Sequence, residues 1–176
     1  LLTDLGGMYG AGKYCRAEND CLTLPELSDI IAESRDYDEL LEAWQGWRTI
    51  SPPMRDMYRR FAELTNEGAV EFGYRDLGDM WRSAYDMSSD EFQAEADRLW
   101  QQVEPLYEEL HCHVRAVLDE HYGQVKVPQV GPIPAHLLGN MWAHQWGFIL
   151  DLLEPFAGVS DLVVDSSLKT KNFSPR

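Results

Sequence analysis

The sequence predicts an all-α protein, and three observations support this. Apolar residues recur every three or four positions along most of its 176 residues, the spacing that places them on one face of a helix. A capping box formed by Thr23 and Glu26 begins one such stretch, and the run 88–91 (SSDE) opens the longest. No alternating run of β-branched residues reaches the length of a strand.

The first half predicts two main helices followed by shorter ones. The periodic pattern behind the Thr23 cap continues to about Thr49 and predicts one amphipathic helix. Ser51 and Pro52 then act as N-cap and first helical residue, and apolar positions continue as far as Leu64. Over 66–87 we expect short helices with breaks, because glycines stand at positions 68, 73 and 78.

The second half predicts a long helix, a loop and another helix. One apolar face persists over 88–121, and Pro105 should kink or interrupt that helix. Residues 123–134 are rich in Gly and Pro and predict an extended loop. Residues 135–156 are expected to be helical up to Gly158, and the tail from Ser160 is too weakly patterned to predict more than a short helix.

Composition excludes several classes of protein. With 44% hydrophobic residues, the chain is not intrinsically disordered. Thirty acidic residues against fifteen basic ones give a net charge of −15, so we do not expect nucleic acid as a partner. No window approaches the roughly 18 successive apolar residues of a membrane span. The first residues do not resemble a signal peptide, and without an initiator Met we expect an excised or partial sequence.

Cysteine spacing leaves two readings open. Cys15 and Cys21 lie six positions apart, which suits either a small disulfide loop in an oxidising compartment or two unpaired loop thiols. Cys112 has no obvious partner, and we expect it to be buried and inert.

Motif chemistry taken alone indicates no activity. Adjacent helical residues point about 100° apart, so His111, Cys112 and His113 cannot converge on one metal ion. The H-E-x-x-H pair of zinc proteases is absent. His121 and His136 are isolated and fit hydrogen-bonded structural roles better than a catalytic base. The tryptophans at helical spacing are typical of a core: Trp44, Trp47, Trp81, Trp100, Trp142 and Trp146.

Four strings in order resemble the angiotensin-converting-enzyme (peptidyl-dipeptidase A) family. The longest spans 131–143 (GPIPAHLLGNMWA). The others are 43–48 (AWQGWR), 78–85 (GDMWRSAY), and 105–107 (PLY) with a following Leu-His. The resemblance covers about residues 8–156, and the pair Cys15 and Cys21 matches a disulfide of that family.

The resemblance implies part of a large helical zinc-peptidase ectodomain, extracellular or membrane-anchored, with a central substrate channel. Such an enzyme releases dipeptides from the C-terminus of oligopeptides. Its zinc ligands and catalytic groups follow Arg176 in the family order, so the resemblance assigns no catalytic or metal-binding residue within 1–176. The partners implied are oligopeptide substrates and the remaining C-terminal half of the ectodomain. Without that half, we expect no peptidase activity, and we expect exposed aromatic residues such as Trp142 and Trp146.

Matched positions imply specific contacts. Arg48 aligns with an arginine that binds a buried chloride, and Tyr85 with a tyrosine that donates to a second chloride. His144 stands where the family has a glutamine that holds the substrate carboxylate; imidazole also donates a hydrogen bond, and imidazolium adds charge. Gln145 is expected to line the neighbouring subsite or take over the amide role.

One other reading of the function stays open. The chain fits a family-like helical module that has lost zinc chemistry and serves as an interaction or receptor domain. Sequence downstream of Arg176 would distinguish the two, since only the enzyme requires H-E-x-x-H followed by Glu.

The sequence has one N-glycosylation pattern, which begins at Asn172 and ends at Ser174. Pro175 follows the serine directly and disfavours modification of Asn172.

Overall fold

A computed structural model of the protein describes residues 1–156 and 170–171. The described part is mostly helical, which confirms the predicted all-α class, and it contains one small β-hairpin. The α-helices are α1 (Leu2–Gly10), α2 (Leu24–Glu33), α3 (Tyr37–Arg48), α4 (Arg55–Glu71), α5 (Leu77–Arg82), α6 (Ser89–Tyr122) and α7 (Leu150–Leu153). Three 3₁₀ turns are η1 (Pro52–Met54), η2 (Ala135–Leu137) and η3 (Gly147–Ile149).

A β-hairpin stands where the sequence predicted no strand. Strands β1 (Lys13–Ala17) and β2 (Asp20–Thr23) pair antiparallel, with Cys15 opposite Cys21 and joined to it by a disulfide. Gly46 on α3 leaves room for the ring of Tyr14, and Tyr14 Oη donates a hydrogen bond to Glu42 at 3.2 Å. Strands of five and four residues are too short to show an alternating apolar pattern, which is why the sequence did not predict them. The disulfide and the packing on α3 stabilise the hairpin.

The predicted single helix over 23–49 is two helices. Its capping box is confirmed, since the Glu26 carboxylate accepts from the Thr23 backbone N–H at 2.7 Å. The break falls at 34–36, where the Asp36 side chain accepts from the backbone N–H of Glu39 and begins α3. Apolar spacing continues across the break because α2 and α3 face the same core. Periodicity alone therefore did not reveal the turn.

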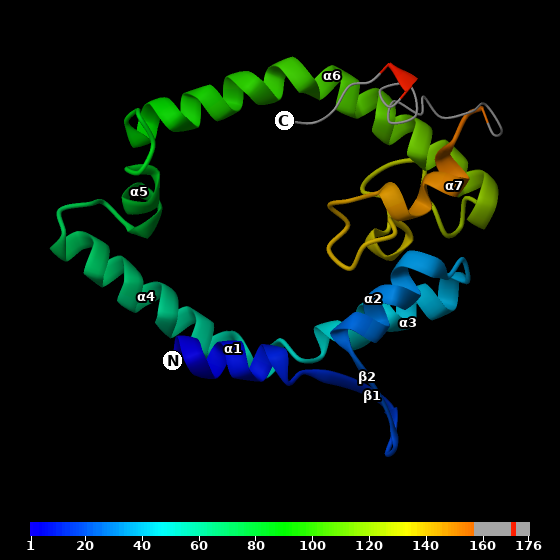
Figure 1. Ribbon diagram of the computed structural model, residues 1–176, viewed down its shortest axis with the longest axis horizontal. Coiled ribbons are helices and arrows are strands. Elements are labelled where there is room, and N and C mark those ends of the chain that lie inside the picture. Colours follow the sequence, from blue (N-terminus) through cyan, green and yellow to red (C-terminus); the bar gives the residue numbers. More distant parts are fainter. Residues whose placement is uncertain (157–169, 172–176) are drawn as a thin grey trace.

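Helices α4, α5 and α6 form one long arm. The start of α6 has a complete capping box between Ser88 and Glu91, and the helix runs through Pro105 without the predicted interruption. Gly68 likewise lies inside α4, whereas Gly73, with φ of +87°, follows the end of that helix. In Figure 1, α4, α5 and the first part of α6 curve round an open centre, away from α2, α3 and α7.

The predicted helix over 135–156 is wrong in this structure. Local hydrogen bonds replace the helical ones: Asn140 Oδ1 accepts from the backbone N–H of Trp142 at 3.0 Å, and Trp146 Nε1 donates to the Ala143 carbonyl at 2.9 Å. Ala143 has φ of +57° and Gly139 φ of +71°, so the chain turns at both positions. Side chains that bond to nearby backbone compete with helix formation, and here they hold turns in its place.

The core lies at one side of the molecule. It gathers α2, α3, the C-terminal part of α6, η2, η3 and α7 with the loop before η2. Its fully buried side chains are Leu27, Ile31, Val114, Leu118, Val127, Leu137 and Met141. Elsewhere among the described residues, Leu5 and Ala69 are the buried apolar side chains, so the long arm contributes little to the core.

Within the described ranges no helix has both the length and the apolar character needed to cross a bilayer. The expectations for the tail and for the glycosylation pattern at Asn172 fall on 157–169 and 172–176, outside the described residues.

Candidate functional site

Arg48 ends α3 with its guanidinium half-buried against two elements. The group lies 3.7 Å from the centroid of the Trp44 ring. Nη1 donates to the Trp44 carbonyl at 3.0 Å and contacts Met141 Sδ at 3.1 Å, and Nη2 donates to the Met141 carbonyl at 2.7 Å. Burial lowers the pKa of Arg48 from its usual value, although an arginine remains charged at neutral pH.

The surroundings of Arg48 provide no counter-charge. In the described part of the chain it forms no ion pair with a carboxylate, despite the many acidic residues nearby in sequence. It lines a cavity of about 730 Å³ together with Tyr9, Ser51, Pro52, Met54, Arg55 and Tyr58. Two guanidinium groups and two phenols give this cavity the chemistry of an anion site.

Tyr85, the second predicted chloride ligand, lies elsewhere. It follows α5, is 56% exposed, and its ring rests on Phe92 of α6 at 4.4 Å between centroids. It does not line the Arg48 cavity. The structure therefore places Arg48 and Tyr85, the two predicted anion ligands, apart from each other.

His144 and Gln145, the predicted substrate contacts, are both exposed and follow the left-handed residue Ala143. The backbone N–H of Ala143 donates to the Asn140 carbonyl at 2.9 Å, and its own carbonyl accepts from Trp146. A non-glycine residue at positive φ costs energy and persists only where its surroundings fix it. This turn holds the segment that carries His144 and Gln145.

One cavity borders this segment, and a second cavity shares Tyr107 with it. The smaller, about 350 Å³, is lined by Tyr107, Leu110, Ala143, His144 and Trp146. Gln145 is not among its lining residues. The ring of Trp146 lies 6.2 Å from those of both Tyr107 and His111, which connects the turn to α6.

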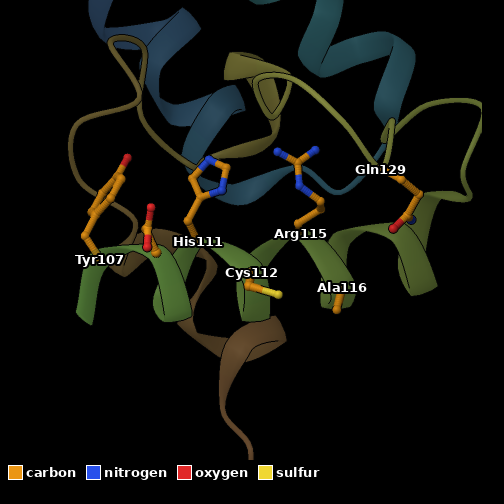
Figure 2. Close-up of a pocket in the computed structure, with 7 residues that line it drawn as sticks. Tyr107, His111, Cys112, Arg115, Ala116 and Gln129 are labelled. Carbon is orange, nitrogen blue, oxygen red and sulfur yellow. The ribbon is translucent and has the colours of Figure 1, made fainter. Parts of the chain in front are cut away.

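The larger of the two, about 440 Å³, lies along α6 (Figure 2). Tyr107, His111 and Arg115 point to the same side of the helix in Figure 2, and Cys112 and Ala116 line the same cavity from the adjacent strip of the helix surface. Arg115 donates to the carbonyls of Pro128 and Gly131, which fixes the loop leading to 131–143 against α6. Tyr107 borders both cavities and is therefore shared by them.

Sequence reasoning missed Tyr107 and Arg115 as site residues, although Tyr107 belonged to one of the matched strings. Their spacing with His111 was an available signal. Positions 107, 111 and 115 are four apart and must share one face if 88–121 is a helix.

The histidines and Cys112 have structural roles of different kinds. His136 is buried, as a structural histidine should be, but its Nε2 finds no hydrogen-bond partner in the described part. Burial lowers the pKa of His136 to about 4. His113 Nε2 donates to the Leu153 carbonyl at 3.0 Å. Cys112 is exposed, which corrects the expectation of a buried thiol, and it lines the cavity along α6.

Comparison with known proteins decides the family. The whole chain, residues 1–176, matches the family model described as angiotensin-converting enzyme. It is 40% identical over its full length to an angiotensin-converting enzyme of Sus scrofa, and 43% identical over 99% of its length to one of Theromyzon tessulatum. The chain belongs to the angiotensin-converting enzyme family.

Membership in the angiotensin-converting enzyme family extends beyond proteins named as enzymes. The chain is 41% identical over 99% of its length to an angiotensin-converting enzyme-like protein, Ace3, of Mus musculus. It spans 13% of the Sus scrofa relative, 29% of the Theromyzon tessulatum relative and 24% of the Mus musculus relative.

Angiotensin-converting enzymes are zinc metallopeptidases, and the described residues do not fit a zinc centre. Among residues 1–156 and 170–171, no group of three or more His, Cys, Asp or Glu side chains is placed to hold a metal ion. Zinc sites need three or four such ligands converging at about 2.0–2.3 Å. The cavities at Arg48 and His144 are lined by side chains that can bind a ligand. The described residues do not supply a set of zinc ligands.

Proposed function

We propose that this chain forms part of the channel wall of a zinc peptidyl-dipeptidase, which releases dipeptides from the C-terminus of oligopeptides. The observation that carries the proposal is the full-length match to the angiotensin-converting enzyme family, at about 40% identity to relatives of that name. The arrangement is consistent with this role, since α4, α5 and α6 curve round an open centre (Figure 1).

His144 serves in this proposal as the anchor for the substrate's terminal carboxylate. Its imidazole is exposed beside the cavity lined by Tyr107 and Trp146, where an entering peptide can reach it. A neutral imidazole donates one hydrogen bond to a carboxylate, and a protonated one adds an ion pair. Gln145 lines the next subsite or supplies a second donor after a change of side-chain conformation.

Arg48 and Tyr85 serve as ligands of two separate chlorides. Support for Arg48 comes from its unpaired guanidinium, its burial and the second arginine, Arg55, in the same cavity. A buried cation without a carboxylate is a favourable position for an anion. The assignment of Tyr85 rests on the match of residues 78–85 to the family. The Tyr85 side chain is exposed, so its hydroxyl can donate to an anion.

The remaining part of the ectodomain supplies the zinc ligands and catalytic groups in this proposal. We place the protein outside the cell, secreted or membrane-anchored, which agrees with the disulfide between Cys15 and Cys21. The exposed tryptophans Trp81, Trp100 and Trp142 then pack against polypeptide that follows these residues.

The decisive experiment is product analysis on a protein that joins this chain to its natural continuation. Incubated with an oligopeptide, it should release C-terminal dipeptides, identified by mass spectrometry. A peptide with an amidated C-terminus is the control and should be cleaved much more slowly, because it lacks the carboxylate. Release of single residues, or no cleavage in the presence of zinc, would contradict the proposal.

The role of His144 has its own readout in the same assay. His144→Ala should raise KM for a tripeptide-like substrate by about tenfold, because the substrate carboxylate loses a hydrogen-bond donor. His144→Gln keeps a donor at this position and should stay close to wild type. If KM of His144→Ala equals that of wild type, His144 is not the anchor.

The alternative is a catalytically inactive interaction domain of the same family. It is favoured by the large apolar side chains exposed along α6, which suit a partner protein. The two functions differ in the product assay, since an interaction domain releases no dipeptide with or without zinc.

A further inference from the structure

Arg35 lies between α2 and α3, and its guanidinium ties the end of α2 to η3 and α7. Nη1 donates to the carbonyls of Ala32 at 3.0 Å and Ser34 at 2.7 Å. Nη2 donates to the Phe148 carbonyl at 2.9 Å and to Asp151 Oδ1 at 2.8 Å. A planar guanidinium can bond in several fixed directions at once, so this one side chain bridges two distant segments. Figure 1 shows α7 on the same side of the molecule as α2 and α3.

The ion pair within this bridge is partly open to solvent. The side chain of Arg35 is 26% exposed and that of Asp151 is 62% exposed. The hydrogen bond from Arg35 lowers the pKa of the Asp151 carboxyl below its usual value, so the pair is charged at neutral pH. An exposed ion pair contributes little to stability. The main effect of Arg35 is therefore on the position of η3.

η3 packs directly on the start of the turn that carries His144. A Cβ added at Gly139 would lie 3.0 Å from Ile149 Cγ2 and 3.1 Å from Phe148 Cβ. Gly139 has φ of +71° and precedes Asn140, whose side chain and carbonyl accept the hydrogen bonds that hold the turn. A shift of η3 would open this close contact, and the turn would lose the surface against which it is placed.

We propose that Arg35 is a positioning residue for the substrate carboxylate: by fixing η3, it fixes the turn over 139–146 that presents His144. The inference rests on the proposed function, which makes His144 the anchor. Arg35 does not line the cavity beside His144, and its Nη atoms bond to protein groups. Its action on the substrate passes through the turn, because a hydrogen bond weakens steeply when its donor moves out of line.

The first test measures KM and kcat in the protein that joins this chain to its natural continuation. Arg35→Met should raise KM for a tripeptide-like substrate by about three- to tenfold, no more than His144→Ala, and leave kcat within about twofold. Arg16→Met is the matched control. It removes the ion pair with Glu42 from a side chain that is 29% exposed, far from the turn, and should change neither constant. An unchanged KM in Arg35→Met, or an equal rise in both variants, overturns the proposal.

A double-mutant cycle separates positioning from a general effect on the fold. In a His144→Ala background, Arg35→Met should raise KM no further, because the anchor that it positions is gone. KM for a peptide with an amidated C-terminus should likewise be the same with and without Arg35. If Arg35→Met raises KM by the same factor in both backgrounds, Arg35 does not act through His144.

A milder variant keeps the test valid if Arg35→Met does not fold, which circular dichroism checks. Asp151→Ala removes one acceptor of the bridge from an exposed position and leaves the bond to the Phe148 carbonyl. It should raise KM in the same direction as Arg35→Met but by a smaller factor. KM equal to that of wild type in Asp151→Ala, with Arg35→Met unfolded, overturns the proposal.

Hydrogen exchange in the longer protein provides a readout that does not depend on catalysis. Peptides covering 139–146 should exchange at least about tenfold faster in Arg35→Met than in Arg16→Met, because the turn opens more often when η3 is released. Equal exchange in the two variants overturns the proposal. If exchange responds as expected but wild type releases no dipeptide, the peptidase function is rejected and the action of Arg35 on the turn stands.

Discussion

Single residues fix how the hairpin meets the core. A Cβ added at Gly46 would lie 2.5 Å from Cγ and Cδ1 of Tyr14, closer than non-bonded atoms approach. Those atoms are near the root of the tyrosine side chain, so they cannot move without moving β1. Gly46 is therefore required by close approach and not by backbone conformation.

Gly46→Ala should lower the free energy of unfolding by about 1–3 kcal/mol, since overpacking forces the Tyr14 ring and strand β1 to shift. Urea unfolding measures the change. Gly68→Ala is the matched control: it lies inside α4 with no atom within 4 Å of the added Cβ, and should stabilise by up to about 1 kcal/mol. A Gly46→Ala variant as stable as wild type would show that the hairpin adapts.

His136 links stability to pH. Its pKa is about 4 in the folded protein because burial disfavours the charged ring, against about 6.5 for an unfolded chain. The unfolded state therefore binds the proton first as pH falls. The stability due to neutral His136 is complete above about pH 6.5 and is lost between 6.5 and 4.

The loss should be at most about 3.5 kcal/mol over that window, at about 1.4 kcal/mol per pH unit. Urea unfolding at pH 7 and pH 4.5 measures it. His136→Leu should flatten the pH dependence relative to wild type, while His144→Gln, at an exposed position, should leave it unchanged. Equal slopes for wild type and His136→Leu would rule out His136 as the source.

At the scale of elements, caps and cross-links set the boundaries. Side chains of Asp36, Asp76 and Ser88 accept from backbone N–H groups and begin α3, α5 and α6. The hairpin of β1 and β2 depends on its disulfide, because two short strands alone are marginally stable.

Replacing Cys15 and Cys21 together by serine should cost about 2 kcal/mol, the value for a loop of this length. Thermal unfolding of the oxidised protein and the double variant measures it. Cys112→Ser is the control and should change little, because that thiol is exposed. A thiol reagent should label one cysteine in the native protein; a Cys112 that reacts only after unfolding would contradict its exposed position.

At the scale of the whole molecule, the arm from α4 to α6 is underpacked. Large apolar side chains such as Phe72, Trp81 and Leu106 are 66% to 77% exposed. A molecule of this kind carries more open apolar surface than a monomer normally retains.

The isolated chain should therefore bind a dye such as anilinonaphthalene sulfonate strongly at neutral pH. Dye fluorescence, compared with a compact protein of similar mass, measures the exposed surface. A dye-negative, cooperatively unfolding monomer would show that the arm is covered in solution.

The sequence by itself determined the helical class, the Thr23 capping box and the long helix after Ser88, because these depend on local spacing and on side chains three or four residues apart. Its matched strings also identified the family and the disulfide partners. Tertiary structure decided the break at Asp36, the hairpin packed on Gly46, and the turn at Ala143 that replaced the expected helix over 135–156. The hairpin depends on a contact between β1 and α3, and the break at Asp36 and the turn at Ala143 depend on side-chain hydrogen bonds to nearby backbone. Local periodicity carries no information about either.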